Sequence, residues 1–149
     1  MIPEVPNGPA GSGRSPSGAP GSVDLGRTSV PSNADAPQLA RAAIKSWMPS
    51  SVARGVRQDA QLLVSELVAN SVQHAGIAAD DPITISSGWT DALLWFEIAD
   101  AGRNQSVTRR APVPLNGMGL NMVDTAASRW GSTDGDGTTV WFELALRTA

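Results

Sequence analysis

The sequence has 149 residues, the size of one domain, and 41% of them are hydrophobic. Its formal net charge of −3 gives no electrostatic case for binding nucleic acid, and no apolar run is long enough to span a membrane. The chain has no cysteine, which excludes disulfides and thiolate metal sites, and its first residues lack the basic and apolar regions of a secretory signal, so we expect a cytoplasmic protein.

Residues 1–33 are rich in Pro, Gly and Ser and carry few large apolar side chains. A segment of this composition cannot bury enough apolar surface to offset the entropy that it loses on ordering. We therefore expect residues 1–33 to be a disordered tail and residues 34–149 to form the folded domain. A plain tail and a docking arm are both open interpretations of the segment.

Two helices are predicted after the tail. Apolar residues recur at helical spacing from Leu39 to Trp47, and again in the segment LLVSELVANSVQHAG, which belongs to a longer helix over residues 57–75. Glu66 and Asn70 are four residues apart in this second helix, so their side chains project from one face. Such a pair also occurs by chance, as a solvated glutamate and an asparagine that bonds a loop backbone.

The second half of the sequence predicts a sheet. Residues 83–87 alternate between apolar and polar, residues 92–99 form a nearly continuous apolar run typical of a central strand, and residues 138–146 alternate again. A shorter strand is expected over residues 130–133. Four tryptophans are expected in the core or at an interface rather than in a ligand cage: Trp89, Trp95, Trp130 and Trp141.

A long loop and a glycine pair lie between these strands. Residues 103–116 show no periodicity and contain two prolines, and loops of that length are usually lids or disordered segments. Gly117 and Gly119 follow, and a short helix is expected from Leu120 to Ser128. The glycines permit close backbone approach, and free N–H groups at the start of a helix attract phosphates, although a plain turn has the same composition.

The order of these motifs resembles one superfamily, that of the gyrase, heat-shock chaperone, histidine kinase and MutL ATPases, with its Bergerat nucleotide fold. The motifs are E-x-x-x-N on a helix, D-x-G after a strand, a long loop, G-x-G-L opening a helix, and G-T opening a last strand. The segments ELVANSVQHA and RWGSTDGDGTTVWFEL look most like the small anti-sigma factor serine kinases and their ATP-binding relatives. The resemblance implies an α/β two-layer sandwich, in which helices cover one face of a mixed, mainly antiparallel sheet.

The resemblance also implies roles for residues of the central helix. Asn70 would hold Mg²⁺, because an amide oxygen suits a hard cation and adds no charge beside the phosphates. Glu66 would be the catalytic residue, since a carboxylate near the metal and the γ-phosphate can accept a proton from the nucleophile. His74 matches a position common in this branch, where packing and phosphate contact are alternatives.

The remaining implied residues would bind the nucleotide. Asp100 would accept a hydrogen bond from the adenine amino group, Gly102 would leave space for the purine, and Thr138 would help to hold the base. An aspartate that caps a turn and an ordinary strand threonine are the structural alternatives. The residues assigned to ATP are thus Asn70, Asp100, Gly102, Gly117, Gly119, Leu120 and Thr138, with Asn70 as the metal ligand.

The implied function is that of a Mg·ATP-binding regulatory protein, a serine/threonine kinase of the anti-sigma factor type that acts on an antagonist partner. The alternative is a module that binds ATP without transfer and sequesters a sigma factor or another regulator. The presence of Glu66 favours the kinase. The segment Pro114-Leu115-Asn116 favours the binding module, because the kinases often have a basic residue at this place before the glycine pair. The resemblance also suggests a homodimer, and neither nucleic acid nor membrane is an expected partner.

Overall fold

The computed structural model describes residue 16 and residues 19–74, 81–100, 123, 126–134 and 137–146. Its helices and strands follow in the order β1 (Val23–Pro31), α1 (Ala36–Trp47), α2 (Arg54–His74), β2 (Pro82–Trp89), β3 (Leu93–Asp100), β4 (Arg129–Asp134) and β5 (Thr138–Ala145). Among these residues, no helix is long and apolar enough to cross a membrane.

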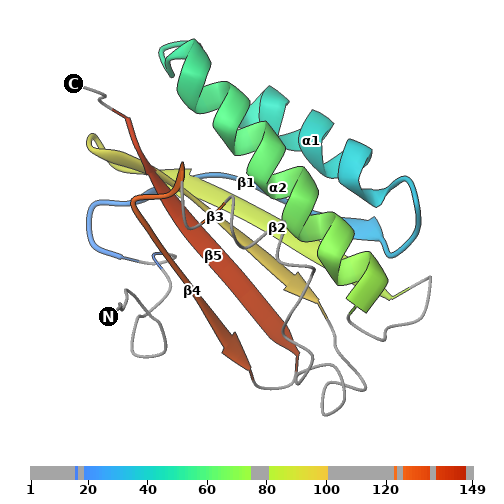
Figure 1. Cartoon of the computed structure of the whole chain (residues 1–149). Helices are drawn as coiled ribbons and strands as arrows, with labels where there is room; N and C mark the ends of the chain where they lie inside the picture. The colour runs from blue at the N-terminus through green and yellow to red at the C-terminus, as the bar shows by residue number, and fades with distance from the viewer. Residues whose placement is uncertain are drawn as a thin grey trace.

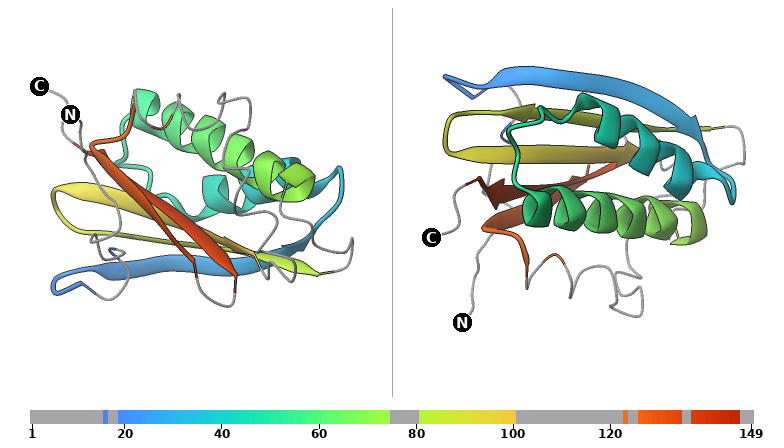
Figure 2. Two further views of the ribbon diagram at one scale, coloured as in Figure 1. Left: turned by 60° about the horizontal axis from the view of Figure 1, so that its bottom comes forward. Right: turned by 90° about the horizontal axis from the view of Figure 1, so that it is seen from above.

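The strands form one five-stranded sheet in the order β1-β2-β3-β5-β4, and all four pairings are antiparallel. The apolar strand β3 lies at the centre, as its sequence predicts. Figures 1 and 2 show both helices on the same face of this sheet. The expected α/β two-layer sandwich is therefore confirmed.

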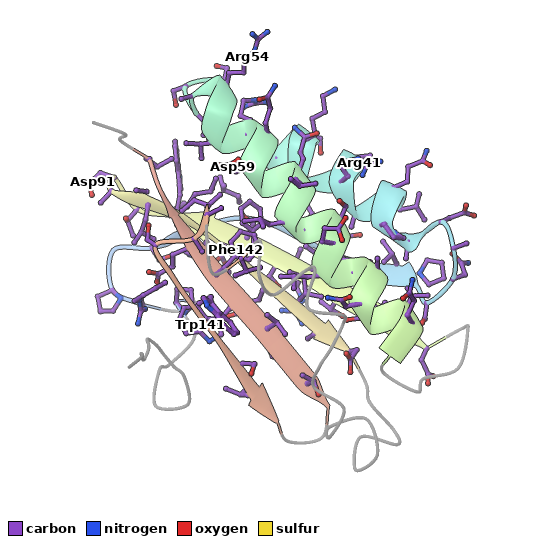
Figure 3. The ribbon with its side chains drawn as sticks, viewed as in Figure 1. Arg41, Arg54, Asp59, Asp91, Trp141 and Phe142 are labelled. Carbon is purple, nitrogen blue, oxygen red and sulfur yellow. The ribbon has the colours of Figure 1, made fainter. Side chains whose placement is uncertain are left out.

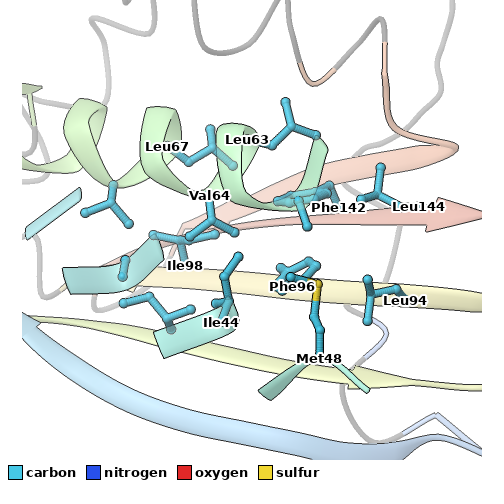
Figure 4. Close-up of a cluster of buried hydrophobic side chains, with 14 of the residues drawn as sticks. Ile44, Met48, Leu63, Val64, Leu67, Leu94, Phe96, Ile98, Phe142 and Leu144 are labelled. Carbon is cyan, nitrogen blue, oxygen red and sulfur yellow. The ribbon is translucent and has the colours of Figure 1, made fainter. Parts of the chain in front are cut away.

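The core lies between the helices and the sheet. Helix α1 buries Ala36, Ala40 and Ile44, which are spaced four residues apart and so lie along one face. Helix α2 contributes two rows of buried side chains, which include Leu63 and Leu67. These side chains meet alternate residues of β3 and β5, as Figure 4 shows.

Two phenylalanines form the centre of that layer. Phe96 on β3 and Phe142 on β5 are direct cross-strand neighbours, and their stacked rings have centroids 5.2 Å apart. Because side chains alternate across a strand, Trp141 lies on the opposite face of β5 from Phe142 (Figure 3). The sheet therefore presents a second face that neither helix covers.

The expectation that residues 1–33 are disordered is wrong for Val23–Pro31, which forms the edge strand β1. Eight residue pairs join β1 to β2, with one irregularity between Asp24 and Gly26. Only Val30 of this strand is buried, so main-chain pairing rather than apolar burial holds most of it in place. Composition does not reveal such pairing, and the folded domain therefore begins earlier than predicted.

Candidate functional site

The site expected from the sequence begins on α2. Glu66 and Asn70 are both half-buried there. Glu66 comes three residues after the buried Leu63, and Asn70 comes three residues after the buried Leu67. Residues three apart on a helix are neighbours, so the polar pair borders the face that packs on the sheet. The two side chains are therefore neither in the core nor on the fully solvated side of α2.

Asp100 and Thr138 form the second part of the site. They are direct cross-strand neighbours at the end of the β3–β5 ladder. By the alternation of side chains, Asp100 shares a face with Ile98 and Phe96, and Thr138 shares it with Val140. Both residues therefore lie on the face that the helices cover.

Chain connectivity brings these two parts to the same end of the domain. Helix α2 ends at His74 and β2 begins at Pro82, and the next residue, Ile83, pairs with Asp100. Figure 1 accordingly shows the C-terminal end of α2 over the end of the sheet where β3 finishes, and Figure 2 agrees. Asn70, four residues before the end of α2, thus lies toward the same end of the domain as Asp100 and Thr138, and Glu66 lies one turn earlier on the helix.

The chemistry of these side chains fits a Mg·nucleotide. The carboxylate of Asp100, one oxygen of which is buried from solvent, only accepts hydrogen bonds when ionised, which suits recognition of an amino group. The Thr138 hydroxyl beside it can donate and accept a hydrogen bond. Asn70 offers a neutral amide oxygen of the kind that magnesium accepts from proteins.

The sequence does not single out Ile83, the neighbour of Asp100 on β2. Its side chain is fully buried on the face that the helices cover. Alternation with Ile85 predicts that it points inward, but only the strand register places it next to Asp100. Ile83 therefore packs in the core directly beside the strand position of Asp100 and anchors that end of β3.

The remaining predicted nucleotide-binding residues lie outside the described residues: Gly102, Gly117, Gly119 and Leu120. The side chain of His74 also falls outside them. The expected helix over residues 120–128 is confirmed in part: Val123 and Ala126 are helical and the Ala127 N–H bonds the Val123 carbonyl at 2.8 Å, whereas Ala127 and Ser128 are not helical. Val123 is fully buried, which fixes this helical turn to the core.

A cavity of about 450 Å³ lies elsewhere, at the opposite end of β3. Its lining includes Val23, Trp89, Asp91 and Leu146, near the β2–β3 turn. None of the residues that the motifs predict lines it. The residues at the other end of the sheet therefore remain the candidate site.

Comparisons with known proteins agree with this geometry. A family model described as the histidine kinase-like ATPase domain matches residues 30–144, whereas the search of curated proteins finds no match. Among solved structures, the chain is similar to the crystal structure of the RsbU and RsbW domains of Rv1364c from Mycobacterium tuberculosis, with 21% sequence identity and a TM-score of 0.58. The similarity covers 83% of this chain but 34% of the other, so this chain spans about a third of that relative's length.

Proposed function

Because the chain belongs to the histidine kinase-like ATPase domain family, whose domain binds ATP, we propose that it is a regulatory serine/threonine kinase of the anti-sigma factor type. It uses Mg·ATP to phosphorylate a protein partner that antagonises the anti-sigma factor. The observation that carries the proposal is the position of Asp100 and Thr138, side by side at the end of the sheet, below the helix that bears Glu66 and Asn70.

In this proposal the end of the β3–β5 ladder binds the base. Asp100 accepts a hydrogen bond from the adenine amino group, and Thr138 holds the same edge through its hydroxyl. Guanine presents a carbonyl at that edge, which leaves the carboxylate facing another acceptor, so the site discriminates against it. Asn70 would hold the magnesium ion, which would supply charge neutralisation at the phosphates.

Glu66 acts on the nucleophile. The partner's serine or threonine hydroxyl oxygen forms a bond to the γ-phosphorus, the bond from that phosphorus to the β–γ bridging oxygen breaks, and ADP leaves. Glu66 accepts the hydroxyl proton as the new bond forms. Glu66 lies one turn before Asn70 on the same face of α2, which supports a role for both side chains at one site.

The second candidate function is a module that binds ATP and a sigma factor or similar regulator without transferring phosphate. The segment Pro114-Leu115-Asn116 favours it, because the resembling kinases often carry a basic residue there. A protein of this kind uses ATP to set the conformation of its partner surface. The similar Mycobacterium tuberculosis structure contains an RsbW domain, which supports a regulatory partner under either candidate.

The deciding experiment incubates the protein with γ-labelled ATP, Mg²⁺ and candidate antagonist partners. We expect label on the partner with wild type and almost none with Glu66→Ala, while both proteins bind Mg·ATP within a few-fold of each other. General-base catalysis is typically worth about 10²–10⁴ in rate, and removing a group that acts only in the transition state spares ground-state binding.

Asp59 offers a matched control. It is an exposed carboxylate two turns before Glu66 on α2, so Asp59→Asn removes an acidic group from the same side of the same helix. This variant should transfer label at the wild-type rate. If wild type binds ATP and its partner yet never transfers label, the non-catalytic module is the correct function.

A further inference from the structure

The cavity of about 450 Å³ lies between the two layers of the domain, at the end of the sheet where β3 begins. Val23 on β1 and Trp89 on β2 are cross-strand neighbours. Trp89 is in step with the core residue Ile85, so both members of the pair lie on the face that the helices cover. Val52, in the connector between α1 and α2, lines the cavity from the helix layer. The cavity is therefore interlayer space that the core side chains do not fill.

The walls of this cavity are largely apolar. Val52 is 4% exposed, and Trp89 and Leu146 are half-buried and pack against the core. Val23 is 60% exposed, more than any other large hydrophobic side chain in the described part of the chain. The apolar wall thus continues from the core to the edge of the sheet, and apolar surface that is continuous in this way favours the binding of another apolar group.

Hydrogen bonds hold the β2–β3 turn and the end of β5 together beside the cavity. The Thr90 N–H bonds the Leu93 carbonyl at 2.8 Å, and Thr90 Oγ1 accepts hydrogen bonds from the N–H groups of Ala92 and Leu93 at 3.1 and 3.2 Å. The Leu146 N–H bonds the Ala92 carbonyl at 3.0 Å. The wall is therefore formed before anything binds, and a preformed site needs little ordering on binding.

The mouth of the cavity is acidic. Of the described residues that line the cavity, only Asp91 is charged, and it is exposed at the tip of the β2–β3 turn (Figure 3). The hydroxyl of Thr90 is engaged in the turn, which leaves that of Ser51 as the other polar side-chain group in the lining. The complementary occupant places an apolar group inside the cavity and a cation beside Asp91.

We propose that this cavity is a docking site for a protein partner, which inserts one aliphatic or aromatic side chain flanked by lysine or arginine. Because the apolar wall continues outward to Val23, the occupant extends along the surface, as a peptide chain does. This chain has a net charge of −3, so a basic partner matches the acidic mouth better than a second copy does.

Docking at this cavity is separate from nucleotide binding and does not depend on phosphate transfer. Asp100 and Thr138 lie at the opposite end of the β3–β5 ladder from the cavity. A partner held at the cavity therefore leaves that end of the sheet accessible.

The first test adds peptides to the full chain labelled with ¹⁵N. The probes are acetylated pentapeptides with a central tryptophan, leucine or phenylalanine flanked by lysines, compared with the same peptides flanked by glutamates or with a central serine. We expect at least one lysine-flanked peptide to shift the amide and indole signals of Trp89 saturably. The amide of Thr138 should stay in place, and saturating Mg·ATP should not displace the peptide. The glutamate and serine peptides should give no saturable shift.

The second test changes the cavity. Val23→Arg places a long cation at its mouth and should abolish peptide binding. Asp91→Asn should weaken binding about two- to fivefold, the usual size of an exposed ion pair. The matched control is Leu39→Arg, because Leu39 is an apolar side chain on α1 that is 45% exposed and does not line the cavity. Asp91→Lys, at an exposed turn position, repels the lysine peptides and tests the site even if Val23→Arg disturbs β1.

Four results would overturn the proposal. No lysine-flanked peptide shifts Trp89, or binding is the same in wild type, Val23→Arg and Asp91→Lys. Tryptamine binds as tightly as the best pentapeptide, in which case the cavity takes a small cationic ligand. Alternatively, the Trp89 signals move with protein concentration alone while ultracentrifugation detects a dimer that Val23→Arg abolishes. In that case a second copy of the chain occupies the site.

Discussion

Asp100 and Thr138 are opposite each other in the last pair of the β3–β5 ladder, so a carboxylate and a hydroxyl share one edge of the sheet. Asp100→Asn replaces the charged acceptor by an amide that presents a donor as readily. A hydrogen bond to a charged group contributes about 1.5–3 kcal/mol, so ATP should bind about ten- to a hundredfold more weakly. Calorimetric titration with ATP and GTP measures this.

Asp91→Asn is the control for that variant, because Asp91 is exposed at the opposite end of β3. It should leave the affinity for ATP unchanged. Equal binding of ATP and GTP by wild type would show that Asp100 does not contact the base.

Asn70 is expected to act through the metal. Asn70→Ala should remove the Mg²⁺-dependent part of ATP affinity and leave a weaker component from the adenine site, while Gln73→Ala, at an exposed position of the same helix turn, should have no effect. Titrations of each protein with ATP in the presence of Mg²⁺ and of a chelator measure the difference. If wild type binds ATP equally well in both, Asn70 is only a structural residue of α2.

Gly26 and Gly55 offer a stability test with opposite expected signs. A Cβ at Gly26 would overlap the indole of Trp47, whereas nothing lies within 4 Å of one at Gly55. Gly26→Ala should therefore lower the free energy of unfolding by about 1–3 kcal/mol, the usual effect of overpacking. Gly55→Ala, in the first turn of α2, should raise it by up to about 1 kcal/mol. Urea denaturation of both variants provides the comparison.

The Arg129–Glu143 pair gives a second stability prediction. The Glu143 side chain is 7% exposed, so Arg129→Ala leaves a nearly buried carboxylate without its two hydrogen bonds. We expect a loss on the order of 1–3 kcal/mol in the free energy of unfolding. Glu143→Gln made in the Arg129→Ala background should restore part of it, because the buried charge is gone. A double-mutant cycle by urea denaturation with no coupling would contradict this account.

Strand β1 provides the fifth prediction. A chain that begins at Ser32 exposes the β2 edge and uncovers the core around Ile83 and Trp47, so its melting temperature should fall well below that of the full chain. The chain that begins at Ala19 keeps β1 and should retain the cooperative transition. Thermal unfolding followed by circular dichroism compares them. Equal melting temperatures would mean that β1 contributes no stability.

Helices and inner strands could be predicted from sequence because their apolar residues repeat at the period of the element. The spacing of Leu63 and Leu67 marks α2, and the run that contains Phe96 marks the central strand β3. The family was predicted from the order of the motifs, and the match over residues 30–144 confirms it. Strand β1 was not predicted because its sequence has no run of buried apolar residues. Val30 is its only buried side chain.

The candidate site was predictable only in part for a related reason. The helical period alone places Glu66 and Asn70 on one face of α2. No local pattern reveals that Asp100 pairs with Thr138 on one side and Ile83 on the other, because strand register depends on the whole sheet. The predicted roles of the glycines at 102, 117 and 119 stay predictions.

The sheet order also constrains the sequence in which the strands can come together. β2–β3 and β4–β5 are neighbours along the chain, whereas β1 pairs with β2 only after both helices have been made and placed. Pairing β1 with β2 closes the long stretch of chain between Pro31 and Pro82. Closing a long loop has an entropic penalty that slows strand pairing. We therefore expect β1 to join the sheet after β2 and β3 have paired, and native-state hydrogen exchange should find β1 opening as a separate unit while β2, β3 and β5 stay closed.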